Sequence, residues 1–208
     1  MRGGLPRRVR CLAVGAVFCA STPAWPANEA VEQFKRGADL VKPYVVLSGR
    51  TEKDPHSEDG RRSLHEGIAS LTRATELRPD YWQALFFLGK AYQAEADHAA
   101  AWQALKRARE LQPGQVDVSR EYALEALCSS HPEEALATAR EAAEAHRADA
   151  ELAANFGFML MMNRQFDAAQ ATTEAALRLD PSDRVTSALL RRIKAVKAGG
   201  PLPDPCQH

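Results

Sequence analysis

A period of 34 residues constrains the fold of this chain more than any other feature. Small residues recur at this interval in two series, and proline recurs in a third. The positions are Gly89, Ala123 and Gly157; Ala101, Ala135 and Ala169; and Pro79, Pro113 and Pro181, with Arg147 in the slot between the last two. A repeat of this length predicts a stack of supersecondary units, each covering the apolar face of its neighbour.

The clearest copy spans residues 80–113 and reads DYWQALFFLGKAYQAEADHAAAWQALKRARELQP. It contains L-G-x2-Y, then A-x3-L, then a closing proline, and so resembles the tetratricopeptide repeat, a helix-turn-helix unit of this length. The resemblance implies an all-α, right-handed superhelical stack with full repeats at about 80–113, 114–147 and 148–181. The small residues are expected where the two helices of a unit cross, because larger side chains there would push the axes apart.

Both ends of the stack depart from the regular pattern. Upstream, ANEAVEQFKRGADLVK and RRSLHEGIASLTRATELRP are expected to form one more helix pair, interrupted by an inserted loop at about 43–60. Downstream, residues 183–197 carry an apolar stripe behind Ser182 or Asp183, which predicts a capped helix that closes the stack. The repeat domain would then span 29–197, followed by a flexible, proline-rich tail at 198–208.

The first 24 residues differ in character from the rest. Four arginines precede an uncharged apolar run and a small-residue segment, which is the pattern of a secretory signal peptide. We expect cleavage after Ala24, with Ser21 or Ala27 as alternative sites. The apolar run is too short to cross a bilayer as a helix, which needs about 20 residues. The sequence therefore predicts an exported bacterial protein, periplasmic or secreted, without a membrane span after cleavage; an uncleaved N-terminal anchor is the alternative.

Charge and cysteine content narrow the possible roles further. Removing residues 1–24 takes away four of the 27 basic residues and none of the 27 acidic ones, so the remaining chain is mildly acidic. This argues against nucleic acid as a partner, because such proteins carry a basic face. The same cleavage leaves Cys128 and Cys206, which form either one disulfide or two free thiols.

Sequence motifs of catalysis are absent. The chain has no G-x-S-x-G, no phosphate-binding glycine loop and no dinucleotide fingerprint, and its six histidines show no metal-ligand spacing. We therefore predict no enzyme activity, no cofactor and no histidine metal site.

The first helix of each unit is expected to line a concave groove. By resemblance, family members grip extended peptides or partner helices with such residues, and Asn155 stands where many repeats carry an asparagine that holds a peptide backbone. Asp117 and Glu121 replace basic residues of the family's carboxylate clamp, so that mode is not expected. The groove positions are Phe86, Lys90 and Gln93; Arg120, Leu124 and Leu127; and Asn155, Phe158, Met161 and Met162.

The prediction is a non-catalytic scaffold for a protein or peptide partner. One alternative is a structural or self-associating subunit of a larger envelope complex, including a homo-oligomer. Another is a soft-metal protein, suggested by the stretch NFGFMLMMNRQF at 155–166 and by Cys128, since thioethers and thiolates bind copper. Met159 and Met161 are expected on different faces of the helix, which argues against a shared metal.

Overall fold

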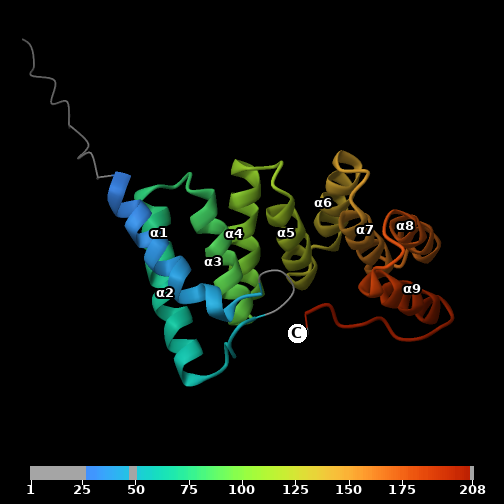
Figure 1. The fold of residues 1–208 in the computed structure, drawn as a ribbon, viewed down its shortest axis with the longest axis horizontal. Coiled ribbons are helices and arrows are strands. Elements are labelled where there is room, and N and C mark those ends of the chain that lie inside the picture. The colour runs from blue at the N-terminus through green and yellow to red at the C-terminus, as the bar shows by residue number, and fades with distance from the viewer. Residues whose placement is uncertain (1–26, 47–50, 207–208) are drawn as a thin grey trace, which may run out of the picture.

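The computed structural model describes residues 27–46 and 51–206 of the 208-residue chain. Within these ranges the chain forms nine α-helices and a short 3-10 helix, arranged as an elongated stack that runs from α1 to α9 (Figure 1). The predicted signal peptide lies outside the described residues. Among the described helices, none has both the length and the apolar character that crossing a membrane requires.

The helices form consecutive antiparallel pairs. Their bounds are α1 Ala27–Val41, η1 Lys42–Tyr44, α2 Glu58–Leu77, α3 Trp82–Ala94, α4 His98–Leu111, α5 Val116–Cys128, α6 Pro132–Ala145, α7 Ala150–Met162, α8 Phe166–Leu179 and α9 Arg184–Lys197.

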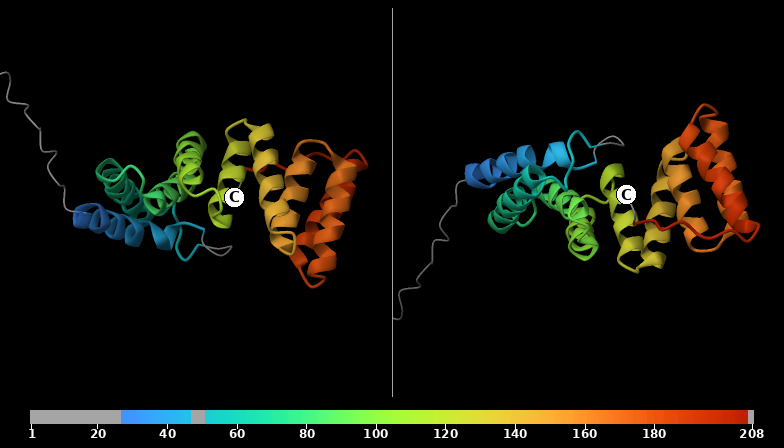
Figure 2. Two further views of the ribbon diagram at one scale, coloured as in Figure 1. Left: turned by 90° about the horizontal axis from the view of Figure 1, so that it is seen from above. Right: turned by 90° about the horizontal axis from the view of Figure 1, so that it is seen from below.

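Each helix packs on the next one in sequence, and α1 also contacts α3, as α7 contacts α9 (Figure 2). Helices α3, α5, α7 and α9 start 34 residues apart. The predicted all-α stack of helix-turn-helix units is confirmed. The inserted segment follows η1, and α2 begins at Glu58 behind the N-cap Ser57, whose hydroxyl accepts from the Gly60 amide.

Glycine marks the crossing of the two helices in three pairs. A Cβ on Gly89 would lie 2.6 Å from Cγ of Leu105, and one on Gly157 would overlap the hydroxyl of Thr173. The facing residues, Leu105 and Thr173, lie one helical turn beyond Ala101 and Ala169, which we expected at the crossing itself. The two alanines are nevertheless fully buried between the helices.

The turn inside each full unit uses a left-handed residue that is not glycine. Ala96, Ser130 and Arg164 have φ of 58°, 65° and 60°. Each donates its amide to a carbonyl three residues back, and the next residue donates to a carbonyl five residues back, as in Asp97 N to Tyr92 O at 2.9 Å. This Schellman geometry satisfies the end of the first helix and reverses the chain at once.

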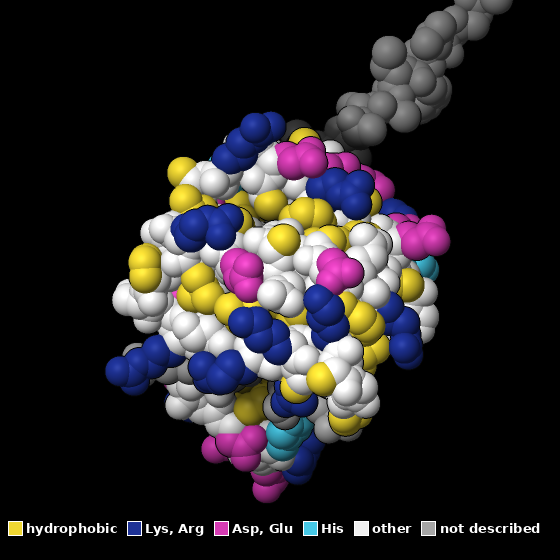
Figure 3. Space-filling model, turned by 90° about the vertical axis from the view of Figure 1, so that its right-hand side faces the viewer, with side chains coloured by type: hydrophobic (Ala, Val, Ile, Leu, Met, Phe, Trp, Pro, Cys, Tyr) yellow, Lys and Arg dark blue, Asp and Glu magenta, His cyan; other side chains and the backbone are white. Residues whose placement is uncertain are grey.

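Helix α9 closes the stack in the way the sequence predicts for a cap. Its N-cap Asp183 accepts from the Val185 amide at 2.8 Å, and Ile193 and Val196 are buried against α7 and α8. Lysine and arginine side chains are spread over this end of the molecule, with smaller apolar patches between them (Figure 3).

The C-terminal tail differs from the flexible segment expected from its prolines. After α9 it turns back along the stack toward α5 (Figure 1). Leu202 packs against the apolar cluster beneath α9, and Cys206 forms a disulfide with Cys128 at the end of α5. Proline favours an extended chain, which is the conformation that lets this short segment span the distance.

Candidate binding groove

Two hollows lie between the first helices of neighbouring units. The α5–α7 hollow has a volume of about 230 Å³, and the α3–α5 hollow about 170 Å³. The α5–α7 hollow is lined by Ser119, Arg120, Glu121, Ala123, Leu124, Ala139, Ala142, Leu152, Asn155, Phe158 and Met159. The α3–α5 hollow is lined by Trp82, Gln83, Phe86, Phe87, Gln115, Asp117 and Val118.

The lining of the α5–α7 hollow is mostly apolar. Leu124 of α5 and Phe158 of α7 are partly exposed, whereas Leu152 and Met159 are buried. Alanines of α5 and α6 complete the apolar surface, and because alanine has no side chain beyond Cβ, space remains between the helices. The hollow therefore suits an apolar side chain from a partner.

One polar group in this hollow lacks a partner. The Nδ2 atom of Asn155 is buried and has no hydrogen-bond partner among the described residues. An unsatisfied buried N–H group costs about 1–3 kcal/mol. Because Nδ2 is itself buried, a carbonyl oxygen in the hollow reaches it once the Asn155 side chain turns toward the hollow, and then gains a hydrogen bond that the free protein does not make.

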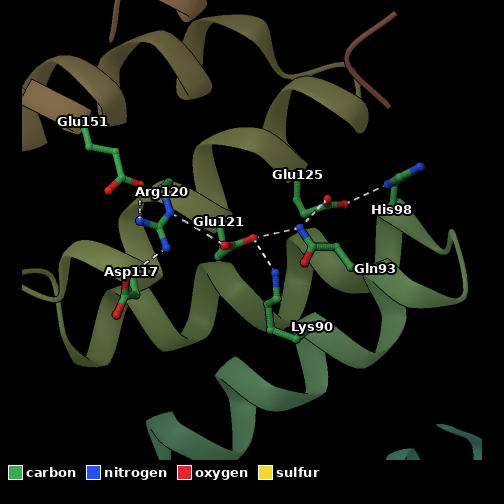
Figure 4. Close-up of polar contacts among 8 residues, drawn as sticks. All are labelled: Lys90, Gln93, His98, Asp117, Arg120, Glu121, Glu125 and Glu151. Carbon is green, nitrogen blue, oxygen red and sulfur yellow. Dashed lines mark hydrogen bonds and ion pairs between the residues drawn. The ribbon is translucent and has the colours of Figure 1, made fainter. Parts of the chain in front are cut away.

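Arg120, at the edge of the same hollow, is already engaged. Its guanidinium donates to Glu151 at 2.7 Å and to Asp117 at 3.0 Å, and its Nε lies 3.8 Å from a Glu121 oxygen (Figure 4). Three carboxylates surround one guanidinium. Arg120 is thus neutralised within the protein and held between α5 and α7.

A second set of side chains, the α3–α5 polar network, joins these two helices and the start of α4 (Figure 4). Lys90 Nζ contacts Glu121 Oε2 at 2.8 Å. Gln93 Nε2 donates to Glu121 Oε2 at 3.0 Å and to Glu125 Oε1 at 2.9 Å. His98 Nδ1 lies 2.9 Å from Glu125 Oε2. The members of the network are Lys90, Gln93, His98, Glu121 and Glu125.

Burial makes this network part of the core between the repeats. Glu125 is 0% exposed and Lys90 is 2% exposed. Buried charges are tolerated only when they are paired and hydrogen-bonded, and both oxygens of Glu125 have a partner. The network fixes α3 against α5.

Helix α5 is also held from its other side. The Tyr122 hydroxyl donates to a carboxylate oxygen of Glu134 on α6. This hydrogen bond holds the pKa of Glu134 below its usual value, and burial together with the same bond raises the pKa of Tyr122 to about 12. Helix α5, which contributes to both hollows, is therefore anchored on both sides.

The structure brings together four of the predicted groove residues and separates the others. Arg120, Leu124, Asn155 and Phe158 line the α5–α7 hollow, and Phe86 lines the α3–α5 hollow. Leu127 and Met162 are partly buried in apolar clusters near the ends of α5 and α7.

Three predicted positions are not open groove surface. Lys90 and Gln93 belong to the polar network, where their polar atoms face Glu121 and Glu125. Met161 is 0% exposed, so its prediction as a groove residue is wrong. It packs in the cluster that contains Ile193 and Val196, because α9 covers that face of α7.

Sequence reasoning missed the polar network. A signal was present for two of its contacts, since Lys90 and Glu121 lie 31 residues apart and Gln93 and Glu125 lie 32 apart, slightly less than one repeat. Arg120 and Glu151 show the same separation. Opposite charges at that spacing on successive first helices would have predicted inter-repeat contacts, although not the depth of their burial.

The methionines suggested as soft-metal ligands do not share one site. Met159 packs in the cluster around Tyr122 and Ala126, and Met161 in the cluster under α9. Cys128 is bonded to Cys206. The packing of these thioethers is explained by the core between repeats, where a flexible side chain fills irregular gaps.

No protein-family model and no curated protein sequence matches this chain. Solved structures do match. MamA from Desulfovibrio magneticus RS-1, residues 41 to the end, has a TM-score of 0.65 at 16% identity over 82% of this chain and 86% of that one. YrrB, a TPR protein with an unusual peptide-binding site, has a TM-score of 0.56 at 20% identity over 66% of this chain and 71% of that one.

The first TPR of Spaghetti (RPAP3), bound to the HSP90 peptide SRMEEVD, has a TM-score of 0.51 at 16% identity over 56% of this chain and 93% of that one. At these identities the likeness concerns the fold. Together with the 34-residue helix spacing, the structural neighbours show that this chain has the tetratricopeptide-repeat fold.

Proposed function

We propose that the chain is a non-catalytic scaffold that binds an extended peptide segment of a protein partner in the α5–α7 hollow. The observation that carries the proposal is the buried, unpartnered Nδ2 of Asn155 beside an apolar lining. A peptide can satisfy both features, because its main-chain carbonyl can accept a hydrogen bond from the Asn155 amide and its side chain can fill the apolar hollow. YrrB and the RPAP3 repeat are solved relatives in fold for which peptide binding is described.

The lining indicates which peptides would fit. The volume of about 230 Å³ exceeds the roughly 150 Å³ that accommodates a benzene-sized group in an apolar cavity. Leu124 and Phe158 offer apolar contact, so a large aliphatic or aromatic side chain is favoured. Arg120 is neutralised by its own carboxylates, so an acidic C-terminus gains little there.

We also propose that the protein acts after export. Support comes from the signal-like first 24 residues and from the Cys128–Cys206 disulfide, since such bonds persist in oxidising compartments. Alkaline phosphatase fused after the repeat domain gives a direct test. Phosphatase activity that depends on residues 1–24 supports export, and activity that persists without them, or is absent with them, contradicts it.

Peptide binding can be tested with a displayed peptide library selected on the oxidised protein. Selected peptides should contain a large apolar residue, and Leu124→Glu should abolish their binding. Asn155→Ala should weaken it about two- to tenfold, the effect of one hydrogen bond. Gln103→Ala removes a side-chain amide from the exposed face of α4; it is the matched control and should leave affinity unchanged. Equal affinity for the parent and all three variants would refute the site.

The self-associating alternative makes a different prediction. If a second copy of the chain fills the hollow, the pure protein forms a concentration-dependent dimer that Leu124→Glu dissociates. Light scattering after size exclusion distinguishes the cases, because the peptide-binding proposal predicts a monomer whose mass does not change with this substitution.

A further inference from the structure

Four potential metal ligands converge where the C-terminal tail meets α5. A ring nitrogen of His98, a Glu125 carboxylate oxygen and Cys128 Sγ lie within 4.8 Å of one another, and His98 Nδ1 lies 2.9 Å from Glu125 Oε2. Cys206 Sγ is bonded to Cys128 Sγ and therefore lies beside these three ligand atoms. The Cα atoms of the two cysteines are 5.6 Å apart. Histidine nitrogen, carboxylate oxygen and two cysteine sulfurs are the atoms that bind Zn²⁺ in tetrahedral sites.

The surroundings hold these side chains in place. Gln93 Nε2 donates to Glu125 Oε1 at 2.9 Å, which leaves Oε2 facing His98 Nδ1. Ser129, next to Cys128, donates its hydroxyl to the main-chain oxygen of His98 at 2.8 Å and so joins the start of α4 to the end of α5. Outer contacts of this kind orient metal ligands.

We propose that the reduced chain binds one Zn²⁺ through His98 Nδ1, Glu125 Oε2 and the thiolates of Cys128 and Cys206. A dithiol reductant supplies two electrons and two protons to the S–S bond, which becomes two thiols while the reductant becomes a disulfide. Zn²⁺ then displaces both thiol protons to solvent and forms two Zn–S bonds. Where Nδ1 carries the proton of its hydrogen bond to Glu125, that proton passes to solvent and Nε2 takes one from solvent, so the imidazole stays neutral and its Nδ1 lone pair is free. Two coordinate bonds to the metal then replace the hydrogen bond between His98 and Glu125.

The distances permit this change with small movements. Zn–N, Zn–O and Zn–S bonds of about 2.0–2.3 Å place tetrahedral ligands about 3.3–3.8 Å apart. His98 and Glu125 must separate slightly, the two sulfurs must move apart to about 3.8 Å once their bond is reduced, and the more distant pairs within the 4.8 Å limit must approach. Cys206 lies in the tail and His98 at the first turn of α4 with its side chain 22% exposed, so both can adjust without moving the buried carboxylate.

This site is separate from the α5–α7 hollow, since none of its four ligands lines that hollow. It gives the tail the same attachment point in two redox states. The disulfide joins Cys206 to α5 in the oxidised chain, and the metal joins it to α5 and α4 in the reduced chain. Zinc binding would therefore oppose oxidation of the two thiols.

The test uses the full chain with Cys11→Ser and Cys19→Ser, so that Cys128 and Cys206 are the thiols counted. The reduced protein is titrated with Zn²⁺ against a competing chelator dye, and with Co²⁺ to detect the thiolate-to-metal charge-transfer band. We expect one ion per chain and the Co²⁺ band in the reduced protein, and neither in the oxidised protein. Circular dichroism reports whether each variant is folded.

Substitutions identify the ligands. Cys206→Ser alters only the tail and should remove the stoichiometric binding, as should Cys128→Ser and His98→Ala. His146→Ala, at an exposed helix end, is the matched control and should bind like the parent. The proposal is overturned if the reduced parent binds no Zn²⁺, or if folded Cys206→Ser and His98→Ala proteins bind it as tightly as the parent.

Discussion

Gln93 Nε2 on α3 donates a 2.9 Å hydrogen bond to Oε1 of Glu125 on α5, whose side chain is fully buried. The same nitrogen also donates to Glu121. One amide group thus holds two carboxylates of the neighbouring repeat, beside the Lys90–Glu121 and His98–Glu125 contacts between the same two units.

Removing this amide should destabilise the stack. We expect Gln93→Ala to lower the free energy of unfolding by about 1.5–3 kcal/mol, the range for hydrogen bonds to charged groups, because a buried carboxylate oxygen loses its donor. Denaturant unfolding followed by circular dichroism measures the change. Gln103→Ala, on the exposed face of α4, makes the same chemical change and should have almost no effect; equal losses in both variants would show that the network does not stabilise the fold.

The close approach of α3 and α4 should make Gly89 intolerant of a side chain. Gly89→Ala places a Cβ 2.6 Å from Cγ of Leu105, which is fully buried. Overpacking of this kind costs about 1–3 kcal/mol. Gly114→Ala is the control, because a Cβ there meets nothing within 4 Å. Thermal unfolding compares the two, and a Gly89→Ala protein as stable as Gly114→Ala would contradict the crossing geometry.

Glycine should instead stabilise the turn between α7 and α8. Arg164 has φ of 60°, in the left-handed region that disfavours side chains. We expect Arg164→Gly to raise the free energy of unfolding by about 0.5–1 kcal/mol. Arg147, in the turn between α6 and α7, is not among the described positive-φ residues, so Arg147→Gly should lower stability through chain entropy. If both substitutions change stability in the same direction, the left-handed backbone of Arg164 is not the cause of the effect.

The Tyr122–Glu134 hydrogen bond predicts a pH dependence. The pKa of folded Glu134 lies below its usual 4.5, so the stabilisation is present above that value and is lost as the pH falls through the folded pKa. The pKa of Tyr122 is raised to about 12, so its contribution is present below about 10 and is lost as the pH rises toward 12. Tyr122→Phe should flatten both limbs.

The measurement is the free energy of unfolding as a function of pH for the two proteins. An acid limb with the same slope in Tyr122→Phe as in the parent would exclude this pair as its source. Tyr92→Phe serves as the control, since it removes a tyrosine of α3 while leaving the Tyr122–Glu134 pair in place.

The sequence predicted the fold well because the 34-residue period follows directly from packing. Gly89 and Gly157 occur where the two helices of a unit touch. Because every unit has the same length, these helix–helix contacts recur at a fixed interval in the sequence. The same 34-residue interval indicated where the helices begin and end. Helix α9, for example, spans Arg184–Lys197, at the end of the stack where a capping helix was expected.

The site was less predictable because it depends on contacts between units. Met161 was assigned to the groove from its place on α7, but the sequence of α7 alone does not show that α9 covers that face. Glu125 looks like an ordinary surface glutamate until Gln93 and His98 are seen to enclose it. The tail was expected to be flexible from its prolines, whereas Leu202 and Cys206 attach it to the stack.

Pairing of a peptide carbonyl with Asn155 in the α5–α7 hollow can be observed through the NMR signal of the Asn155 side-chain amide during titration with a library-selected peptide. We expect this signal and the Leu124 methyl signals to shift with one common affinity. Asn155→Asp, which replaces the amide donor, should weaken binding. Shifts confined to α4, α6 and α8, with the Asn155 amide unchanged at saturation, would contradict this pairing.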